Sequence, residues 1–411
     1  GDAERALAAM KDASRYTRGH LSRDAVHALY GGAVTLSASR MDMARSCHFA
    51  YFMRYGLKAR ERTGAGFDAP QIGTFVHDVM EHTLRQAKEC GGLHTLSKDK
   101  LHALVRASIE EYIDRVLPDL SEKSARFRYL FNRLCATVER IMDEVSEELQ
   151  SSDFEPLAFE LEFGADGQLP AITIREENGT ARVVGKVDRV DGWLHDGKLY
   201  LRVVDYKTGK KSFDLAELRY GLGLQMLLYL FTLKEEGQML FGGHEIVPAG
   251  VLYTPAREPM LRCARDTEPE TIEKALKKEL RRSGMVLEDP AVLQAMEHSA
   301  LESPCYLPIA VKRDGAVTGS LASAEQLGKL SKYVDHILHE ITQEVFAGNI
   351  DADPYARTPQ QSACTYCEFA SACHFENGCG SDRMEYIKAT KNDEFWQYID
   401  EVNGEGAHEN G

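Results

Sequence analysis

Residues 199–210 read LYLRVVDYKTGK, an apolar run that carries two charges close to its end. Bulky and β-branched residues surround a single Arg202 and predict one buried strand, which ends at Gly209. Alternate residues of a strand point to the same face, so Asp205 and Lys207 emerge side by side from a hydrophobic wall. A charge pair at the end of a buried strand costs desolvation energy. The pair therefore marks either a solvated strand end or part of a functional site.

Length and composition limit the class of protein. The chain has 411 residues, of which 43% are hydrophobic and 27% charged, enough for two or three domains or for one domain with large insertions. It contains no run of about eighteen apolar residues, so we expect no membrane span. Nine cysteines without an apolar signal core favour the reducing cytoplasm over a disulfide framework. The net charge of −15 disfavours indiscriminate nucleic-acid binding but allows local basic patches.

Changes in pattern divide the chain into six segments. In order, they are an N-terminal helical segment (1–34), a helical part (35–153), a core sheet with a motif-bearing helix (154–260), a helical or mixed insertion (261–350), a cysteine-rich segment (351–380) and an acidic tail (381–411). The first residues, GDAERALAAMKD, contain no initiator methionine at their start. We therefore expect a domain excised from a longer protein.

The helical part contains two candidate site residues, Cys47 and His77. Ser37 is placed as the N-cap of an apolar, aromatic helix that we expect to contain Cys47. The run IGTFVHDVMEHTLRQA predicts a second helix, in which His77 and Glu81 share one face. A histidine on such a face is more often a packed core residue than a ligand. His77 therefore becomes a site residue only if other residues converge on it.

The strand region carries two acidic candidates. Residues 156–164 alternate and place Glu160 on the polar face, and residues 171–207 read as a meander of three strands. Asp188 lies in the middle strand of this meander. A further strand at 243–255 is expected to close the sheet. Both acids therefore belong to the same predicted sheet as the opening stretch.

A hydrophobic helix is predicted after the opening stretch, over 219–233. Gln225 and Tyr229 lie at i and i+4 of this helix and share a face. They form either a polar stripe on a core helix or part of a site. Residues 192–198 have the spacing of a P-loop, but Leu199 replaces the required Ser or Thr and the segment reads as strand–turn–strand. We therefore reject a P-loop.

Three cysteines, Cys364, Cys367 and Cys373, have the spacing C-x2-C-x5-C. Three thiols so close together in a cytosolic chain indicate a soft-metal site rather than unrelated cysteines. A tetrahedral site needs a fourth ligand, for which Cys379 and Cys47 are both candidates. Spacing alone leaves the choice of fourth ligand open, and the choice between zinc and an iron–sulfur cluster as well.

Taken in order, these motifs resemble the RecB-like nucleases of the PD-(D/E)XK superfamily, in particular the C-terminal nuclease domains of AddB subunits of AddAB-type helicase–nucleases. The resemblance covers most of residues 35–375. It is carried by LSASR followed by Cys47, G-x-x-x-H ending at His77, Glu160, G-x-x-D ending at Asp188, D-Y-K at 205–207, G-L-x-L-Q-x-x-x-Y with Gln225 and Tyr229, and C-x2-C-x5-C. Each motif alone is weak, and their order and spacing are specific.

The resemblance implies an α/β fold and a cofactor. The fold is a restriction-endonuclease-like core, a central mixed sheet flanked by helices, with helical insertions. In this family four cysteines bind a 4Fe–4S cluster that pins the two ends of the domain together. By resemblance the ligands are Cys47, Cys364, Cys367 and Cys373, and not Cys379. We expect this iron–sulfur staple to serve structure rather than redox chemistry, with zinc as the less favoured occupant.

The predicted chemistry is phosphodiester hydrolysis with Mg2+ or Mn2+. Asp188 and Asp205 offer carboxylate oxygens, which Mg2+ prefers, and His77 adds a nitrogen that also suits Mn2+. The backbone carbonyl of Tyr206 completes the predicted metal ligands. Lys207 is expected to orient the attacking water or to stabilise negative charge. Three more catalytic residues are expected: Gln225 and Tyr229, which position water, lysine or phosphate, and Glu160, which binds the metal directly or through water.

The predicted function is a metal-dependent deoxyribonuclease of exonuclease type. We expect it to process single-stranded DNA ends, by resemblance those of the 5′-ending strand, in double-strand-break repair and recombination with a helicase partner. The alternatives are a stand-alone RecB-like nuclease, a catalytically idle DNA-end-binding or scaffold module, and a zinc-stapled structural protein. The idle module is disfavoured because the motif residues are all present: His77, Asp188, Asp205, Lys207 and Gln225.

Overall fold

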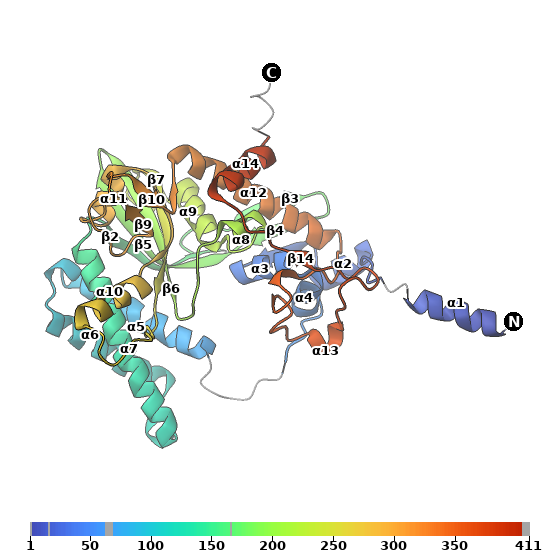
Figure 1. Ribbon diagram of the computed structural model, residues 1–411, viewed down its shortest axis with the longest axis horizontal. Helices are drawn as coiled ribbons and strands as arrows, with labels where there is room; N and C mark the ends of the chain where they lie inside the picture. Colours follow the sequence, from blue (N-terminus) through green and yellow to red (C-terminus); the bar gives the residue numbers. More distant parts are fainter. Residues whose placement is uncertain (1, 15–16, 62–68, 165–166, 405–411) are drawn as a thin grey trace.

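The computed structural model describes residues 2–14, 17–61, 69–164 and 167–404 (Figure 1). The α-helices are α1 (Asp2–Ser14), α2 (Arg23–Tyr30), α3 (Ala38–Ser46), α4 (His48–Tyr51), α5 (Ala69–Glu89), α6 (Lys98–Val116), α7 (Ala125–Gln150), α8 (Leu215–Arg219), α9 (Gln225–Glu236), α10 (Pro269–Glu279), α11 (Pro290–Met296), α12 (Ala324–Phe346), α13 (Ala370–Cys373) and α14 (Asn392–Val402). The strands are β1 (Ala33–Leu36), β2 (Glu155–Phe163), β3 (Ile172–Glu176), β4 (Gly179–Val183), β5 (Gly185–His195), β6 (Lys198–Lys207), β7 (Glu245–Pro255), β8 (Ser283–Leu287), β9 (Ile309–Val311), β10 (Val317–Gly319), β11 (Leu321–Ala322), β12 (Tyr355–Thr358), β13 (Gln361–Ser362) and β14 (Glu385–Tyr386). No helix within these ranges is both long and apolar enough to cross a membrane.

A six-stranded mixed sheet forms the centre of the fold, in the order β11-β8-β7-β6-β5-β2. β2, β5 and β6 pair antiparallel, whereas β6 and β7 pair parallel, with α8 and α9 in the connection between them. Such a crossover is needed because parallel neighbours cannot be joined by a tight turn. The opening stretch of the sequence is therefore the inner strand β6, as its near-continuous apolar run indicates. This confirms the predicted central mixed sheet.

Helices cover both faces of this sheet. α5, α6 and α7 pack on one another, and α9 packs on β6 and β7 with α12 beyond it. Figure 1 shows α9 and α12 to one side of the sheet and the α5–α7 layer below it. Arg202 of β6 reaches Glu148 of α7, so the even-numbered side chains of β6 face α7. Asp205 and Lys207 point to the other face because strand side chains alternate.

The expected meander of three strands is wrong in one respect, because its middle strand is two strands that belong to different sheets. β3 and β4 form a hairpin that pairs with β1 in a three-stranded sheet, whereas β5 belongs to the central sheet. The change occurs at Val184, whose N–H donates to Leu36 O of β1 at 2.9 Å. The next residue, Gly185, already pairs with Phe163 of β2. A single residue therefore carries the chain from one sheet into the other.

Two further boundaries differ from the expectation. β7 does not close the sheet, because β8 pairs antiparallel with it and β11 pairs with β8. The hydrophobic helix predicted over 219–233 begins only at Gln225, after a break that follows α8. Gly221 and Gly223 lie in this break with φ values of 74° and 68°, a conformation in which glycine is favoured. The break places Gln225 in the first turn of α9.

Candidate metal centre and cysteine cavity

Asp188 binds the backbone of β6 at the point where the ladder between β5 and β6 ends. The last ladder pair is Arg189 with Val204, and directly beyond it Asp188 Oδ2 accepts a hydrogen bond from the Tyr206 N–H at 2.8 Å. The Asp188 side chain is 11% exposed. The hydrogen bond fixes one carboxylate oxygen and leaves the other directed towards α5.

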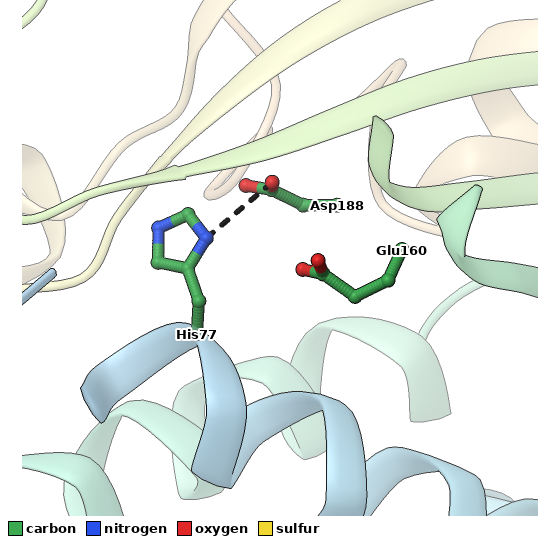
Figure 2. A group of neighbouring side chains, drawn as sticks. All are labelled: His77, Glu160 and Asp188. Carbon is green, nitrogen blue, oxygen red and sulfur yellow. Dashed lines mark ion pairs between the residues drawn. The ribbon is translucent and has the colours of Figure 1, made fainter. Parts of the chain in front are cut away.

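His77 of α5 bridges the two strands. Its Nδ1 lies 3.4 Å from Asp188 Oδ1, and its Nε2 lies 2.9 Å from the carbonyl oxygen of Tyr206 (Figure 2). Burial by itself lowers the pKa of His77, but the hydrogen bond and charge of Asp188, followed by the charge of Asp205, raise it overall. The structure therefore contains the predicted helix, and it brings His77, Asp188 and Tyr206 together.

Glu160 completes a tight group with His77 and Asp188. One ligand atom from each of the three residues lies within 4.8 Å of the others, and Figure 2 shows both carboxylates near the imidazole. Glu160 also pairs with Lys186 and has a φ of 49° within β2, a sparsely populated conformation that costs about 1–3 kcal/mol. The group opens into a cleft of about 420 Å3, which also has Gly73, Thr74, Asp78 and Glu81 in its lining.

Asp205 and Lys207 form an ion pair beside this group rather than within it. Lys207 Nζ lies 2.7 Å from the buried Asp205 Oδ2. Burial, and then the charge of Asp188, raise the pKa of Asp205 to about 6 despite the opposing effect of Lys207. The closest set of candidate ligands is thus His77, Glu160 and Asp188, with Asp205 next to it.

Gln225 and Tyr229 belong to α9, which packs on β6 and β7 and reaches Gly185 of β5. Gln225 Nε2 donates to Tyr229 OH at 3.1 Å, which fits the predicted shared face. The Tyr229 ring packs against Gly185, where an added Cβ would lie 2.5 Å from its Cε1 atom. The G-x-x-D motif therefore needs its glycine because α9 lies so close to β5.

A buried charge network on the α7 face of the sheet was not foreseen. Arg189 pairs with Asp191 at 2.8 Å and donates to Tyr206 OH at 2.6 Å, and Arg202 donates to Asp191 at 2.9 Å. Glu148 of α7 continues the network to Arg202 and to Arg282, its partner at 2.6 Å. Charges within a predicted buried strand, such as Arg202 in β6, were the available signal. The network lies behind Tyr206, whose carbonyl faces His77.

The donor atoms at the cleft suit a hard divalent cation. Carboxylate and carbonyl oxygens with one imidazole nitrogen are ligands that Mg2+ and Mn2+ accept. Asp205 Oδ2 is buried and has Lys207 Nζ as its charged neighbour at 2.7 Å, and a divalent ion would further offset the desolvation of this carboxylate. The residues present therefore fit a divalent metal.

Four cysteines from distant parts of the chain line one cavity of about 190 Å3. They are Cys47, Cys364, Cys367 and Cys373. Cys47 does not lie within a helix as expected but in extended backbone between α3 and α4. Cys379 is exposed and is absent from the residues that line the cavity. Burial raises the pKa of the Cys47 thiol to about 12, a cost that a metal would remove by binding the thiolate.

Comparison with known proteins extends these observations. Residues 35–374 match the PD-(D/E)XK nuclease superfamily. The B subunit of the ATP-dependent helicase/deoxyribonuclease of Acetivibrio thermocellus is 33% identical over 92% of this chain and 33% of that protein. The proteins of the same name from Thermoanaerobacter sp. and Ruminiclostridium cellulolyticum are each 31% identical, over 92% and 93% of this chain and 33% of their own length. The chain thus spans about a third of the length of the curated relatives it matches.

Proposed function

The chain belongs to the PD-(D/E)XK nuclease superfamily, and on that premise we propose that it is a divalent-metal-dependent deoxyribonuclease that degrades DNA ends. The observation that carries the proposal is the convergence of His77, Asp188 and Glu160 on one open cleft. Relatives named as helicase/deoxyribonuclease subunits support DNA as the substrate.

His77, Asp188 and Asp205, with the carbonyl of Tyr206, are the proposed metal ligands, and Glu160 binds directly or through water. His77 Nε2 and the Tyr206 carbonyl oxygen lie 2.9 Å apart, so both groups would be available to hold the same ion. When bound, the divalent ion would polarise the scissile phosphate and make water more acidic.

The side chains around these ligands supply the remaining chemistry. Lys207, held by Asp205 and with its Nζ 5.6 Å from the centre of the Tyr253 ring, donates hydrogen bonds to the attacking water or to a phosphate oxygen. Gln225 and Tyr229 fix the position of the water, the lysine or the nearby phosphate. A partly desolvated ammonium group stabilises the negative charge that develops on phosphate more strongly than it would in water.

A cleavage assay on labelled single strands tests the proposal. We expect the wild-type chain to cleave with Mg2+ or Mn2+ and to lose activity with a chelator, and Asp205→Ala to be inactive. Asp196→Asn is the matched control, because Asp196 lies in the turn at the far end of the same strand pair with its side chain 89% exposed. Metal-independent cleavage, or full activity of Asp205→Ala, would contradict the proposed centre.

The substrate end and the partner follow from the family and are proposed with it. We propose processing of single-stranded ends, the 5′-ending strand in particular, in the cytoplasm during double-strand-break repair and recombination, with a helicase partner. Strands labelled at the 5′ or the 3′ end distinguish the two polarities by the size of the first labelled product. DNA-end binding without cleavage at any metal concentration would favour the idle scaffold module instead. Full processive degradation without a partner would favour a stand-alone nuclease.

We also propose that the four cysteines of the cavity bind a 4Fe–4S cluster that serves structure. The convergence of Cys47 with three cysteines beyond residue 360 supports this, since the cluster would join two distant parts of the chain. Anaerobically purified protein should be brown and contain iron and sulfide, whereas a zinc protein would be colourless. Cys367→Ser should lose the colour and weaken DNA binding, and Cys379→Ser should keep both. A Cys367→Ser protein that remains folded and fully active without iron would refute the structural role.

A further inference from the structure

Arg18 and its partner Asp382 both lie outside residues 35–374, the part of the chain that matches the family. The Arg18 side chain is 2% exposed and that of Asp382 is 3% exposed, although neither residue belongs to a helix or strand. Arg18 Nε donates to Asp382 Oδ1 at 2.8 Å, and its Nη2 donates to Asp382 Oδ2 at 3.0 Å. Such two-pronged pairing fixes the orientation of the guanidinium plane.

The same guanidinium reaches the wall of the cysteine cavity. Arg18 Nη2 also donates to the carbonyl oxygen of Cys373 at 2.8 Å, and Cζ lies 4.3 Å from the centre of the Phe49 ring. Cys373 and Phe49 both line the cavity. Cys373 ends the short helix α13, and His374 follows it with a φ of 49°. Its carbonyl thus belongs to a helix end, where carbonyls lack intrahelical partners, and Arg18 provides the partner.

The charge of Arg18 matters because of what the cavity would hold. A cluster bound by four thiolates carries a net negative charge, and the remaining lining is largely alanine, proline and phenylalanine. A buried negative charge needs a nearby cation or hydrogen-bond donors. A guanidinium suits this position because it stays protonated at any physiological pH.

We propose that Arg18 is a positioning residue for the four-cysteine site. It holds Cys373 and the Phe49 ring in the cavity wall, and it balances the charge of Asp382, which would otherwise add to the negative charge of the bound cluster. The inference rests on the iron–sulfur occupancy proposed above. The N-terminal segment would then form part of the cofactor site, although it lies outside the matched nuclease range.

The experiment compares wild type, Arg18→Gln and Arg18→Lys with the matched control Arg383→Gln, all as the full chain purified without oxygen. Arg383 donates to the backbone carbonyl of Asp382 at 2.7 Å but is exposed, and neither Cys373 nor Phe49 is its hydrogen-bond partner. The measurements are iron and sulfide content, the rate at which an iron chelator bleaches the protein, the midpoint potential of the cluster, and circular dichroism as a check of folding.

We expect Arg18→Gln to bleach about tenfold faster than wild type, as typically follows from the loss of an outer partner of a metal site. Its midpoint potential should be lower, because the Asp382 carboxylate, no longer balanced by Arg18, disfavours the more negative, reduced cluster. Arg18→Lys keeps the positive charge but cannot pair with the carboxylate through two nitrogen atoms. We therefore expect an intermediate bleaching rate with a midpoint potential close to that of wild type. Arg383→Gln should resemble wild type.

Two results would overturn the role of Arg18: bleaching of Arg18→Gln at the wild-type rate with an unchanged potential, or equally fast bleaching of Arg383→Gln. If Arg18→Gln fails to fold, Arg18→Lys decides, and a wild-type bleaching rate in that variant overturns the proposal. Wild-type protein without iron and sulfide would instead refute the occupancy of the cysteines. That failure is separate from the nuclease proposal, which the cleavage assay tests.

Discussion

Replacing Glu148 by glutamine tests whether the buried charge network stabilises the sheet behind the metal centre. Glu148 is 1% exposed, and its carboxylate lies 2.6 Å from Arg282 and 3.4 Å from Arg202. Burial by itself raises the pKa of Glu148, but the charges of Arg282 and then Arg202 lower it overall, from 4.5 to about 2. A carboxylate with a lower pKa in the folded state stabilises the fold at neutral pH.

The magnitude follows from the two pKa values. At about 1.4 kcal/mol per unit, the shift is worth about 3 kcal/mol at neutral pH. This stabilisation is complete well above pH 4.5 and is lost as the pH falls towards 2, because the unfolded chain binds the proton first. The measured cost of breaking buried ion pairs, about 3–5 kcal/mol, is of the same size. We therefore expect Glu148→Gln to lower the free energy of unfolding by about 3 kcal/mol at pH 7.

Urea unfolding followed by circular dichroism measures this difference. Near pH 3.5 the gap between wild type and Glu148→Gln should narrow to about 2 kcal/mol, because part of the wild-type stabilisation is already lost. Glu147→Gln is the matched control, since Glu147 is the exposed neighbour on α7. The reasoning is refuted if Glu148→Gln and Glu147→Gln agree within about 0.5 kcal/mol at both pH values.

Three other predictions concern the metal centre and the cysteines. Gly185→Ala should lower cleavage at least tenfold in the assay above, because its Cβ would lie 2.5 Å from the tyrosine ring of α9; wild-type activity would show that α9 can move aside. Tyr206→Phe removes the hydroxyl that accepts a hydrogen bond from the buried Arg189 guanidinium. The Mn2+ concentration for half-maximal cleavage should therefore rise about tenfold. Tyr333→Phe, which changes a buried tyrosine elsewhere, is the control and should leave this concentration unchanged. Cys47→Ser should lower the free energy of unfolding by about 6 kcal/mol in the simple loop-closure view, whereas Cys263→Ser, at an exposed site, should change it little; equal stability of the two variants would contradict a cross-link through Cys47.

Local patterns predicted much of the fold and the grouping of the motif residues. The spacing of apolar residues indicated α5, and the apolar run with Asp205 and Lys207 indicated β6. His77 and Asp188 meet as expected because each sits at a fixed place in a regular element. The spacing of apolar residues along one helix or strand reflects which of its faces is buried. The sequence of that element alone therefore indicates its type and its buried face.

Features that depend on partners distant in the sequence were missed or misplaced. The switch of sheet at Val184 depends on a hydrogen bond to Leu36, and nothing near Val184 in the sequence signals it. β8 was overlooked because a strand of five residues is too short to show a clear alternation of apolar and polar side chains. The network of Arg202 with Glu148 joins a strand to a helix, and although a charge in a buried strand signals that a partner exists, the local sequence does not say which residue it is.

The cysteine cavity also sets an order of events during synthesis. Cys373 emerges from the ribosome roughly 330 residues after Cys47, a delay of about 16–65 s at about 5–20 residues per second. All strands of the central sheet lie between these two cysteines. The sheet is therefore complete in the nascent chain before the last wall of the cavity exists. All four cysteines are therefore present only after the sheet has been synthesised, and a chain truncated before Cys373 would carry the whole central sheet without a finished cavity.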